Sequence, residues 1–573
     1  MSFKRFQENI IKLNKKTYIN FSLVVAIILV LNFLSSFYYK RFDLTEEKRY
    51  SLSQPTKDFL TNLDDIVSIQ VFLTGKGLPS GLKELEHSTS DILNEFKAYA
   101  GNKIEYEFIN VNEYDTETKN NVIKFLKEQG LSPINLQVVD DEEKKQKIIF
   151  PGAILKYKGR TMSVILLENK IGKNQFEIIN NSIALLEYKF ANSIQKLKRN
   201  KQPFVAFTQG NGELNQLQIG SLLDAMQHNF FKVEGIDLSN EYVINPLIDI
   251  LIIAKPTIRF SEKDKYKIDQ FVMNGGKVIW ALEGMSADMD SLKGQDFFMA
   301  RAKDVNLGDQ MFKYGIRINE DLVQDLQNTP ISLVTGELNG QPQLQNFPWL
   351  FNPLMFSSEK HAIVKNLEPV KSSFVSTLDT IKTIGTKKTF LLTTSKYSKA
   401  LMNPVRVFLG LIQDQPNPKN FKQAHLPTAV LLEGKFTSVF KGRLTNQFIE
   451  ATDTVEKLKY KEQSKATKMI VISDGDFFAN DIEKGKALPL GFDRNSKTNF
   501  GNKAFILNCL EFLIDDNNLI ETRNKEIKLR QLDSIKVKEE KWFWQQVNLI
   551  LPSLLVAIFG FIFYFIRKKR FAI

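Results

Sequence analysis

The stretch 248–283 constrains the fold of this chain most, because it has the pattern of a strand, a helix and a second strand. Residues 248–254 form a short, nearly unbroken apolar run, which is typical of a strand buried on both faces of a sheet. A helix is expected to start at Ser261 and to end at Asn274-Gly275-Gly276, where residues that tolerate positive φ follow one another. The apolar run 277–282 supplies the second strand. Parallel strands joined by a helix form a right-handed crossover, so we predict a doubly wound α/β domain.

This α/β domain is assigned to residues 201–518, with an elaboration at about 307–460 where Asn, Gly and Pro residues separate short strands. Residues 43–200 have the element order of a thioredoxin-like domain, with Pro133 at the entrance to the third strand. Gly75-Lys76-Gly77 stands where a Cys-x-x-Cys motif would follow the first strand, so disulfide exchange is excluded. We therefore expect this domain to bind or to act as a spacer. Its predicted elements are strands at 66–74, 103–110, 133–139, 153–157 and 162–167 and helices at 82–100, 119–129 and 176–197.

Two segments without charged residues, 18–39 and 547–566, are long enough to cross a membrane, which needs about 20 residues. Basic residues lie on the terminal side of each segment. Because cytoplasmic flanks carry the excess of Lys and Arg, we predict two spans of a bacterial inner membrane, with both termini cytoplasmic and 41–546 periplasmic. In chain order, the predicted parts are the N-terminal tail 1–17, the span 18–39, the thioredoxin-like domain 43–200, the α/β domain 201–518, the charged connector 519–546, the span 547–566 and the basic tail 567–573.

The charge, cysteine and motif content exclude several classes of function. The net charge is +12, but each terminal tail carries +4, so the distribution argues against a nucleic-acid-binding surface. The single cysteine, Cys509, lies in a helical pattern and is expected to be a buried apolar residue and not a nucleophile. The four histidines stand far apart and lack the spacing of zinc ligands. No Gly-x-x-x-x-Gly-Lys-Ser/Thr motif occurs, so any ATP hydrolysis must come from a partner, and we expect no cofactor.

Two predicted strand ends carry the candidate ligand-binding residues. The turn Gly210-Asn211-Gly212-Glu213 follows a strand at 203–208, and Asp474 and Asp476 follow a strand at 468–473. Ligands of open α/β sheets bind where strands end. The turn lacks the third glycine of a dinucleotide motif, so a tight strand-to-helix turn is the simpler interpretation. No further acid or histidine cluster accompanies the two aspartates, which favours turn capping over a metal site.

Several segments together resemble a known family. LIIAKP, FVMNGGKVIWALEG, SDGDFFAN and GNKAFILNCLEFL look like the auxiliary-protein domain associated with ABC transporters. The flanks DLTEEKRYSLSQPTKDFL and NKEIKLRQLD, with the C-terminal apolar segment, are similar to the GldG-type gliding-motility family of Bacteroidetes. The resemblance implies a periplasmic subunit of a GldA/GldF/GldG-type complex, in which one partner is an ABC ATPase and another is a multi-span permease. It also implies an α/β domain similar to the glutamine-amidotransferase-like and intraflagellar-transport-related folds.

Two hypotheses of different class follow. The first is a non-enzymatic, membrane-anchored subunit of an ABC complex, since the resemblance carries over no catalytic residue and Asn211 stands where many relatives have histidine. Envelope components are further candidate partners of such a subunit. The second is a degenerate envelope-polymer hydrolase, or a binding protein acting outside any transporter. A hydrolase would use Asp474, Asp476 or Glu213 as acid or base and would need a pocket that gathers these carboxylates.

Overall fold

The computed structural model describes residues 15–37, 51–140, 143–168, 172–338, 340–358, 361–413, 415–443, 460–515, 517–524 and 534–571. The chain divides into two compact units, Met1–Ser53 and Gln54–Ile573. The first unit contains helix α2, Lys15–Phe37. The apolar stretch found in this helix among the described residues is Ile19–Val30, which is shorter than a membrane span. The first predicted span therefore stays a prediction.

The second unit begins with a four-stranded sheet in the order β2-β1-β5-β6, in which β1 is parallel to β2 and antiparallel to β5. The helices and strands of this first part of the unit are α3 (Gln54–Thr61), β1 (Val67–Val71), α4 (Ser80–Ala100), β2 (Ile104–Phe108), α5 (Thr116–Glu128), β3 (Ile134–Asp140), β4 (Glu143–Ile149), β5 (Gly152–Tyr157), β6 (Arg160–Ile165) and α6 (Gln175–Lys198). The strands predicted at 153–157 and 162–167 are present as β5 and β6, which form a hairpin with Lys158 and Gly159 at positive φ in its turn. The predicted third strand, β3, instead pairs with β4 in a separate two-stranded sheet. The thioredoxin-like assignment of this region stays a prediction.

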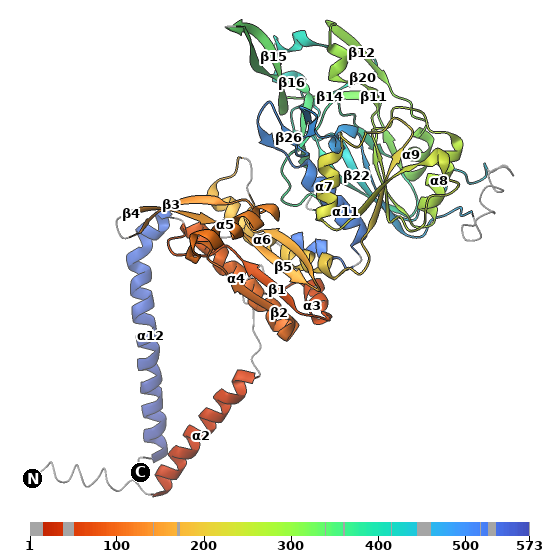
Figure 1. The fold of residues 1–573 in the computed structure, drawn as a ribbon. Coiled ribbons are helices and arrows are strands. Elements are labelled where there is room, and N and C mark those ends of the chain that lie inside the picture. The colour runs from red at the N-terminus through yellow and green to blue at the C-terminus, as the bar shows by residue number, and fades with distance from the viewer. Residues whose placement is uncertain are drawn as a thin grey trace, which may run out of the picture. The chain divides into compact units, whose positions relative to one another are not determined.

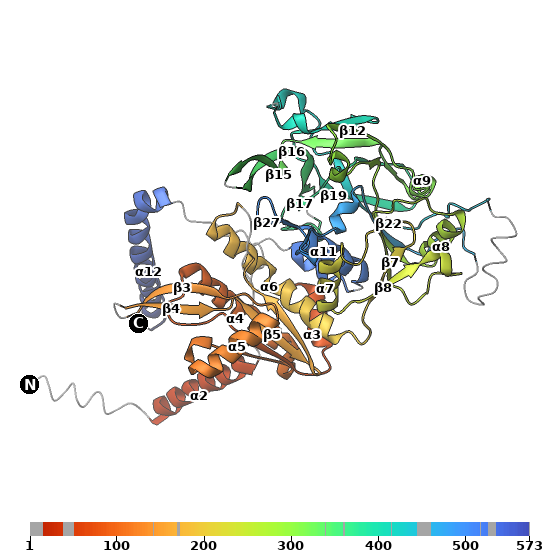
Figure 2. The same cartoon turned by 45° about the horizontal axis from the view of Figure 1, so that its top comes forward.

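The larger part of the second unit is built on a ten-stranded sheet (Figure 1). Its main path is β15-β16-β19-β22-β23-β10-β9-β7-β8, and β17 pairs with β16. The strands β23, β10, β9, β7 and β8 are parallel, whereas β22, β19, β16 and β15 continue the sheet in antiparallel pairs. The predicted elaboration at 307–460 thus supplies the antiparallel half of the same sheet. Its edge is a long hairpin of β15 and β16, which run side by side in Figures 1 and 2.

The helices and strands of this larger part are numbered in chain order. They are β7 (Phe204–Gln209), α7 (Gly220–His228), β8 (Lys232–Asp237), β9 (Ile250–Ala254), α8 (Glu262–Met273), β10 (Lys277–Ala281), β11 (Met285–Ser286), β12 (Phe297–Ala302), α9 (Gly308–Tyr314), β13 (Ile316–Ile318), β14 (Asp321–Asp325), β15 (Asn328–Leu338), β16 (Gln341–Ser357), β17 (Val370–Lys371), β18 (Leu378–Thr380), β19 (Thr386–Thr393), β20 (Ser398–Met402), β21 (Val405–Phe408), β22 (Pro427–Gly434), β23 (Thr467–Ile472), β24 (Ile482–Glu483), β25 (Lys486–Ala487), β26 (Phe492–Asp493), β27 (Thr498–Asn499) and α11 (Asn502–Ile514).

The strand–helix–strand unit predicted from 248–283 is confirmed as β9, α8 and β10. The two strands are parallel, with Lys277 opposite Ile250. The hydroxyl of Ser261 caps α8 by accepting a hydrogen bond from the backbone N–H of Asp264 at 3.1 Å. Every residue of β9 is buried, as a strand covered on both faces requires.

Helices cover both faces of the parallel strands, as Figures 1 and 2 show for α7 and α11 on one side and α8 and α9 on the other. The core on the α11 side includes Phe505 and Cys509, and the core on the α8 side includes Phe271 and Trp280. Cys509 is fully buried, and burial raises the pKa of its thiol well above the ordinary value. A buried, protonated thiol is a poor nucleophile, in agreement with the packing role predicted for it.

The C-terminal region differs from the predicted connector. Residues 519–524 form a short 3-10 helix, η8, in which Leu519 and Ile520 are buried, so the predicted connector begins inside the folded domain. Helix α12, Ser534–Phe571, then starts within the predicted connector. Its segment Glu539–Arg570 is long and apolar enough to cross a membrane by length and composition.

Candidate functional site

The carboxyl ends of the parallel strands bring chemically active side chains to one edge of the large sheet. Lys255 follows β9, Glu283 lies just beyond β10, and Asp474 lies just beyond β23. Because β10 lies between β9 and β23 in the sheet, these three residues come from neighbouring strands. The glycine-rich turn 210–213 follows β7, the next strand along. This edge is the position where open α/β sheets bind ligands.

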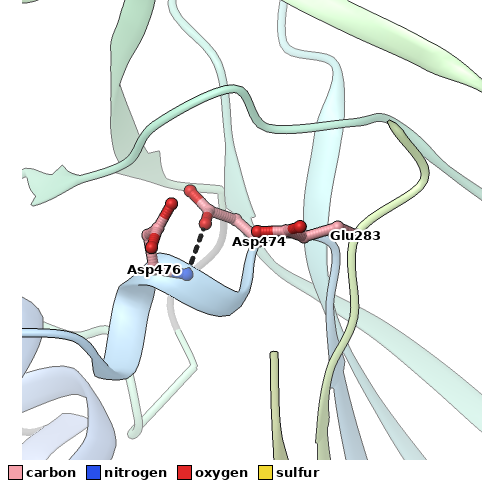
Figure 3. Close-up of side chains that lie close together, drawn as sticks. All are labelled: Glu283, Asp474 and Asp476. Carbon is pink, nitrogen blue, oxygen red and sulfur yellow. Dashed lines mark hydrogen bonds between the residues drawn. The ribbon is translucent and has the colours of Figure 1, made fainter. Parts of the chain in front are cut away.

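Three carboxylates gather at this edge, and Figure 3 shows them close together. Glu283, Asp474 and Asp476 each offer an oxygen within 4.8 Å of the others. Asp474 begins the 3-10 helix Gly475–Phe478 and accepts hydrogen bonds from the backbone N–H groups of Asp476 at 2.7 Å and Ser373 at 2.8 Å. Asp474 is only 1% exposed, and burial, reinforced by the neighbouring Asp476, raises its pKa well above the ordinary value.

Two lysines pair with Glu283 and Asp476, the two acids of the cluster that form ion pairs among the described residues. The Nζ of Lys255 lies 2.5 Å from Oδ1 of Asp476 and 3.2 Å from Oε1 of Glu283. The Nζ of Lys303 lies 2.7 Å from Oε2 of Glu283. Burial alone would lower the pKa of Lys255, but the carboxylates of Asp476 and Glu283 outweigh burial and raise it above the ordinary value. Lys255 therefore stays charged.

The expectation that no further acid accompanies Asp474 and Asp476 was wrong, because Glu283 joins them. Its sequence signal was its position directly after a buried strand, but only the strand order shows that β10 and β23 are neighbours. The oxygens satisfy the spacing that a metal ion requires. However, Lys255 and Lys303 already supply the positive charge that a cation would contribute. The cluster is thus an ion-pair network of Glu283 and Asp476 with two lysines, beside the buried Asp474.

The loop after β9 packs against the turn Gly210-Asn211-Gly212-Glu213 and is hydrogen-bonded to it. The carbonyl oxygen of Asn211 accepts hydrogen bonds from the N–H groups of Thr257 and Ile258, at 2.9 and 2.8 Å. Gly210 and Gly212 have φ of 104° and 71°, and a Cβ on Gly212 would lie 2.0 Å from Oγ1 of Thr257. Both glycines are therefore required for a tight turn.

Glu213 is held within this turn and does not join the three acids. One of its carboxylate oxygens accepts a hydrogen bond from the N–H of Asn211 at 2.7 Å, and the other is buried without a hydrogen-bond partner. The metal-compatible cluster found among the described residues contains Glu283 and both aspartates but not Glu213. The two sets of predicted site residues are thus on the same sheet edge but form separate structures.

A polar cleft of about 740 Å³ opens beside the acid cluster. Its walls include Ser332 and Leu344 of the β15–β16 hairpin, Lys371 of β17 and Arg494 after β26. Of the three acids that the hydrolase hypothesis requires, only Asp476 lines this cleft. The volume suits a small ligand, but the cleft does not gather the three acids that were predicted for a hydrolase.

Comparison with known families shows to which protein family the chain belongs. A family described as an ABC-type uncharacterized transport system matches residues 202–509, which are more than half of the chain and contain the whole parallel sheet. The chain belongs to this family of ABC-transport-system auxiliary proteins. A second family, a domain of unknown function, matches residues 46–156.

Two individual proteins extend the comparison. An uncharacterized protein of Borreliella burgdorferi is 21% identical over 566 residues, which cover 96% of this chain and 98% of the relative. The similarity therefore runs through both matched regions. Among solved structures, the N-terminal domain of mmIFT52 is 13% identical, with a TM-score of 0.29, and the match covers 55% of this chain and 98% of that domain.

Proposed function

We propose that this chain is a non-enzymatic, membrane-anchored subunit of an ABC transporter complex of the GldA/GldF/GldG type, linked to gliding motility. The observation that carries the proposal is the presence, in one chain, of the ABC-transport family domain at 202–509 and of the apolar helix α12. The gliding-motility type is supported by the resemblance of the segments 43–60 and 524–533 to that family. In this proposal residues 43–200 form a thioredoxin-like domain, and residues 201–518 form a glutamine-amidotransferase-like α/β domain.

The non-enzymatic assignment is supported by the arrangement of the acids. A hydrolase of polymers needs a carboxylic acid and a carboxylate facing the same substrate. Asp474 is buried and capped by backbone N–H groups, whereas Asp476 is paired with Lys255. Glu213 is occupied in its own turn. We infer that this edge stabilises the domain and that the complex draws its chemistry from a separate ATPase.

The proposed topology has two spans, with both termini in the cytoplasm and the domains between them in the periplasm. Reporter fusions test it directly: a fluorescent protein that matures only in the cytoplasm should be bright at either terminus. An alkaline phosphatase inserted in the exposed turn at Lys484 and Gly485 should be active, since this enzyme requires the periplasm. A dark C-terminal fusion combined with an active phosphatase at that end would overturn the two-span topology.

The proposed partners are an ABC ATPase and a multi-span permease. Full-length tagged protein, purified from its native membrane in mild detergent after gentle cross-linking, should carry both partners in a fixed ratio by mass spectrometry. The family assignment gives the reason, because an auxiliary protein without a phosphate-binding loop depends on another chain for ATP hydrolysis. Recovery of the chain alone, or only with envelope polymers, would contradict the proposal.

A further inference from the structure

The outer face of a small three-stranded sheet has an unusual composition. In the sheet β11-β12-β21, Phe297 lies opposite Phe408 and Met299 lies opposite Arg406. Arg301 follows at the next outward position of β12. We call these five residues the β12–β21 face. The intervening residues turn inward, since Ala300, Val405 and Val407 belong to a buried core cluster.

Two of the three apolar side chains of the β12–β21 face are exposed, and the third, Phe408, is half-buried. Phe297 is 43% exposed and Met299 is 41% exposed. One exposed apolar residue requires no explanation, but here aromatic, methionine and arginine side chains adjoin one another on paired strands. Phe, Met and Arg are the residues enriched in protein interfaces. The composition therefore favours a surface that another polypeptide covers.

Arg406 is held in place by two aromatic rings. Its guanidinium carbon lies 4.4 Å from the ring centroid of Phe297 and 5.2 Å from that of Phe408. The rings fix the position of the guanidinium group through cation–π contacts. Among the residues that the structure describes, no side-chain hydrogen bond or ion pair engages Arg406 or Arg301. The face thus carries two positive charges whose N–H donors no described residue engages.

We propose that the β12–β21 face is a docking site for another polypeptide that presents an aspartate or glutamate beside an apolar side chain. A guanidinium group binds a carboxylate through two parallel N–H donors, and its flanking rings would contact the adjoining apolar group. A protein is favoured over a phospholipid because Phe297 and Met299 lie on a sheet face and not on an amphipathic helix. Peripheral proteins commonly enter the lipid interface with the apolar face of such a helix. The inference does not depend on which complex contains the chain.

The test is site-specific photo-cross-linking of the full-length protein in its native cells. Met299 is replaced by p-benzoylphenylalanine, and adducts are identified by mass spectrometry after irradiation. We expect an adduct with a segment of a different protein that carries Asp or Glu within a few residues of the cross-link. Arg406→Gln should lower the adduct yield at least about fivefold, and Arg406→Lys should lower it less because the charge remains. Changing the partner's acid to its amide should have the effect of Arg406→Gln.

Matched controls separate docking from general reactivity. Arg317→Gln removes an exposed arginine of β13 that pairs with Asp379, and it should leave the adduct unchanged. The same photoreactive residue at Met402, which is 69% exposed on β20, should not give this adduct. The thermal unfolding of the Arg406→Gln protein should match that of wild type. Adducts that form only with phospholipid, or only with a second copy of the chain, would reject the docking site. A cross-linked partner segment that contains no Asp or Glu would also reject it. So would an adduct yield at Met299 no higher than at Met402, or a yield that Arg406→Gln leaves unchanged.

Discussion

Lys255→Met is expected to lower the free energy of unfolding by about 3 kcal/mol, because breaking a buried ion pair leaves an uncompensated charge. Methionine has nearly the same length but no charge, so Asp476 loses its cation and Glu283 keeps only Lys303. The effect lies at the lower end of the range for buried pairs, since the Asp476 side chain is 26% exposed. The positive φ of Lys255, 55°, is equally unfavourable for both residues and cancels in the comparison.

The measurement is chemical unfolding of the full-length protein in mild detergent, followed by the emission of Trp280 and Trp349, which are almost fully buried. Lys293→Met is the matched control, because Lys293 pairs with Asp290 while both side chains are largely exposed. Exposed pairs contribute about 0–1 kcal/mol, so this control should unfold like wild type. Adding Asp476→Asn to Lys255→Met should recover part of the loss. If Lys255→Met and Lys293→Met were equally stable, the ion-pair network would not hold this sheet edge together.

The strand–helix–strand unit could be predicted because its determinants are local. The apolar run of β9, the Ser261 cap and the glycines after Asn274 each act within a few residues along the chain. The acid cluster could be predicted only in part, because Glu283 and Asp474 are far apart in sequence. They meet because β23 pairs with β10 after a long excursion of the chain, and no local pattern specifies that pairing.

Two other differences have a common physical reason. Strand β4, with the sequence EKKQKII, and helix η8, with LIETRN, are rich in charged residues. A search for apolar periodicity passes over such segments. Strand β4 is nevertheless held by backbone pairing with β3. Helix η8 buries Leu519 and Ile520, and its Arg523 donates a hydrogen bond to the carbonyl oxygen of Lys365 at 2.9 Å. Pairing with the adjacent strand decides the first, packing against the rest of the domain decides the second, and local composition decides neither.

Glu511→Gln is expected to destabilise the protein by about 3–5 kcal/mol, because it leaves two buried cations without their counter-charge. One carboxylate oxygen of Glu511, on α11, lies 3.1 Å from Nζ of Lys196, and the other lies 3.0 Å from a guanidinium nitrogen of Arg199. The three side chains are 5%, 8% and 16% exposed. Glutamine preserves the shape of the side chain, so the lost charge dominates the change. Chemical unfolding of the full-length protein should show the loss.

This substitution also tests how the region 54–198 is joined to the large sheet domain. Lys196 belongs to α6, the last helix of that region, whereas Glu511 belongs to α11, which packs on the large sheet. If the pair joins the two, Glu511→Gln should also expose the chain near Arg199 to trypsin. Glu177→Gln is the matched control, because it removes an exposed ion pair with Lys173 near the other end of α6 and should cost under about 0.5 kcal/mol. Equal stability and equal proteolysis of the two variants would show that the junction is held by apolar packing, with no measurable part for Glu511.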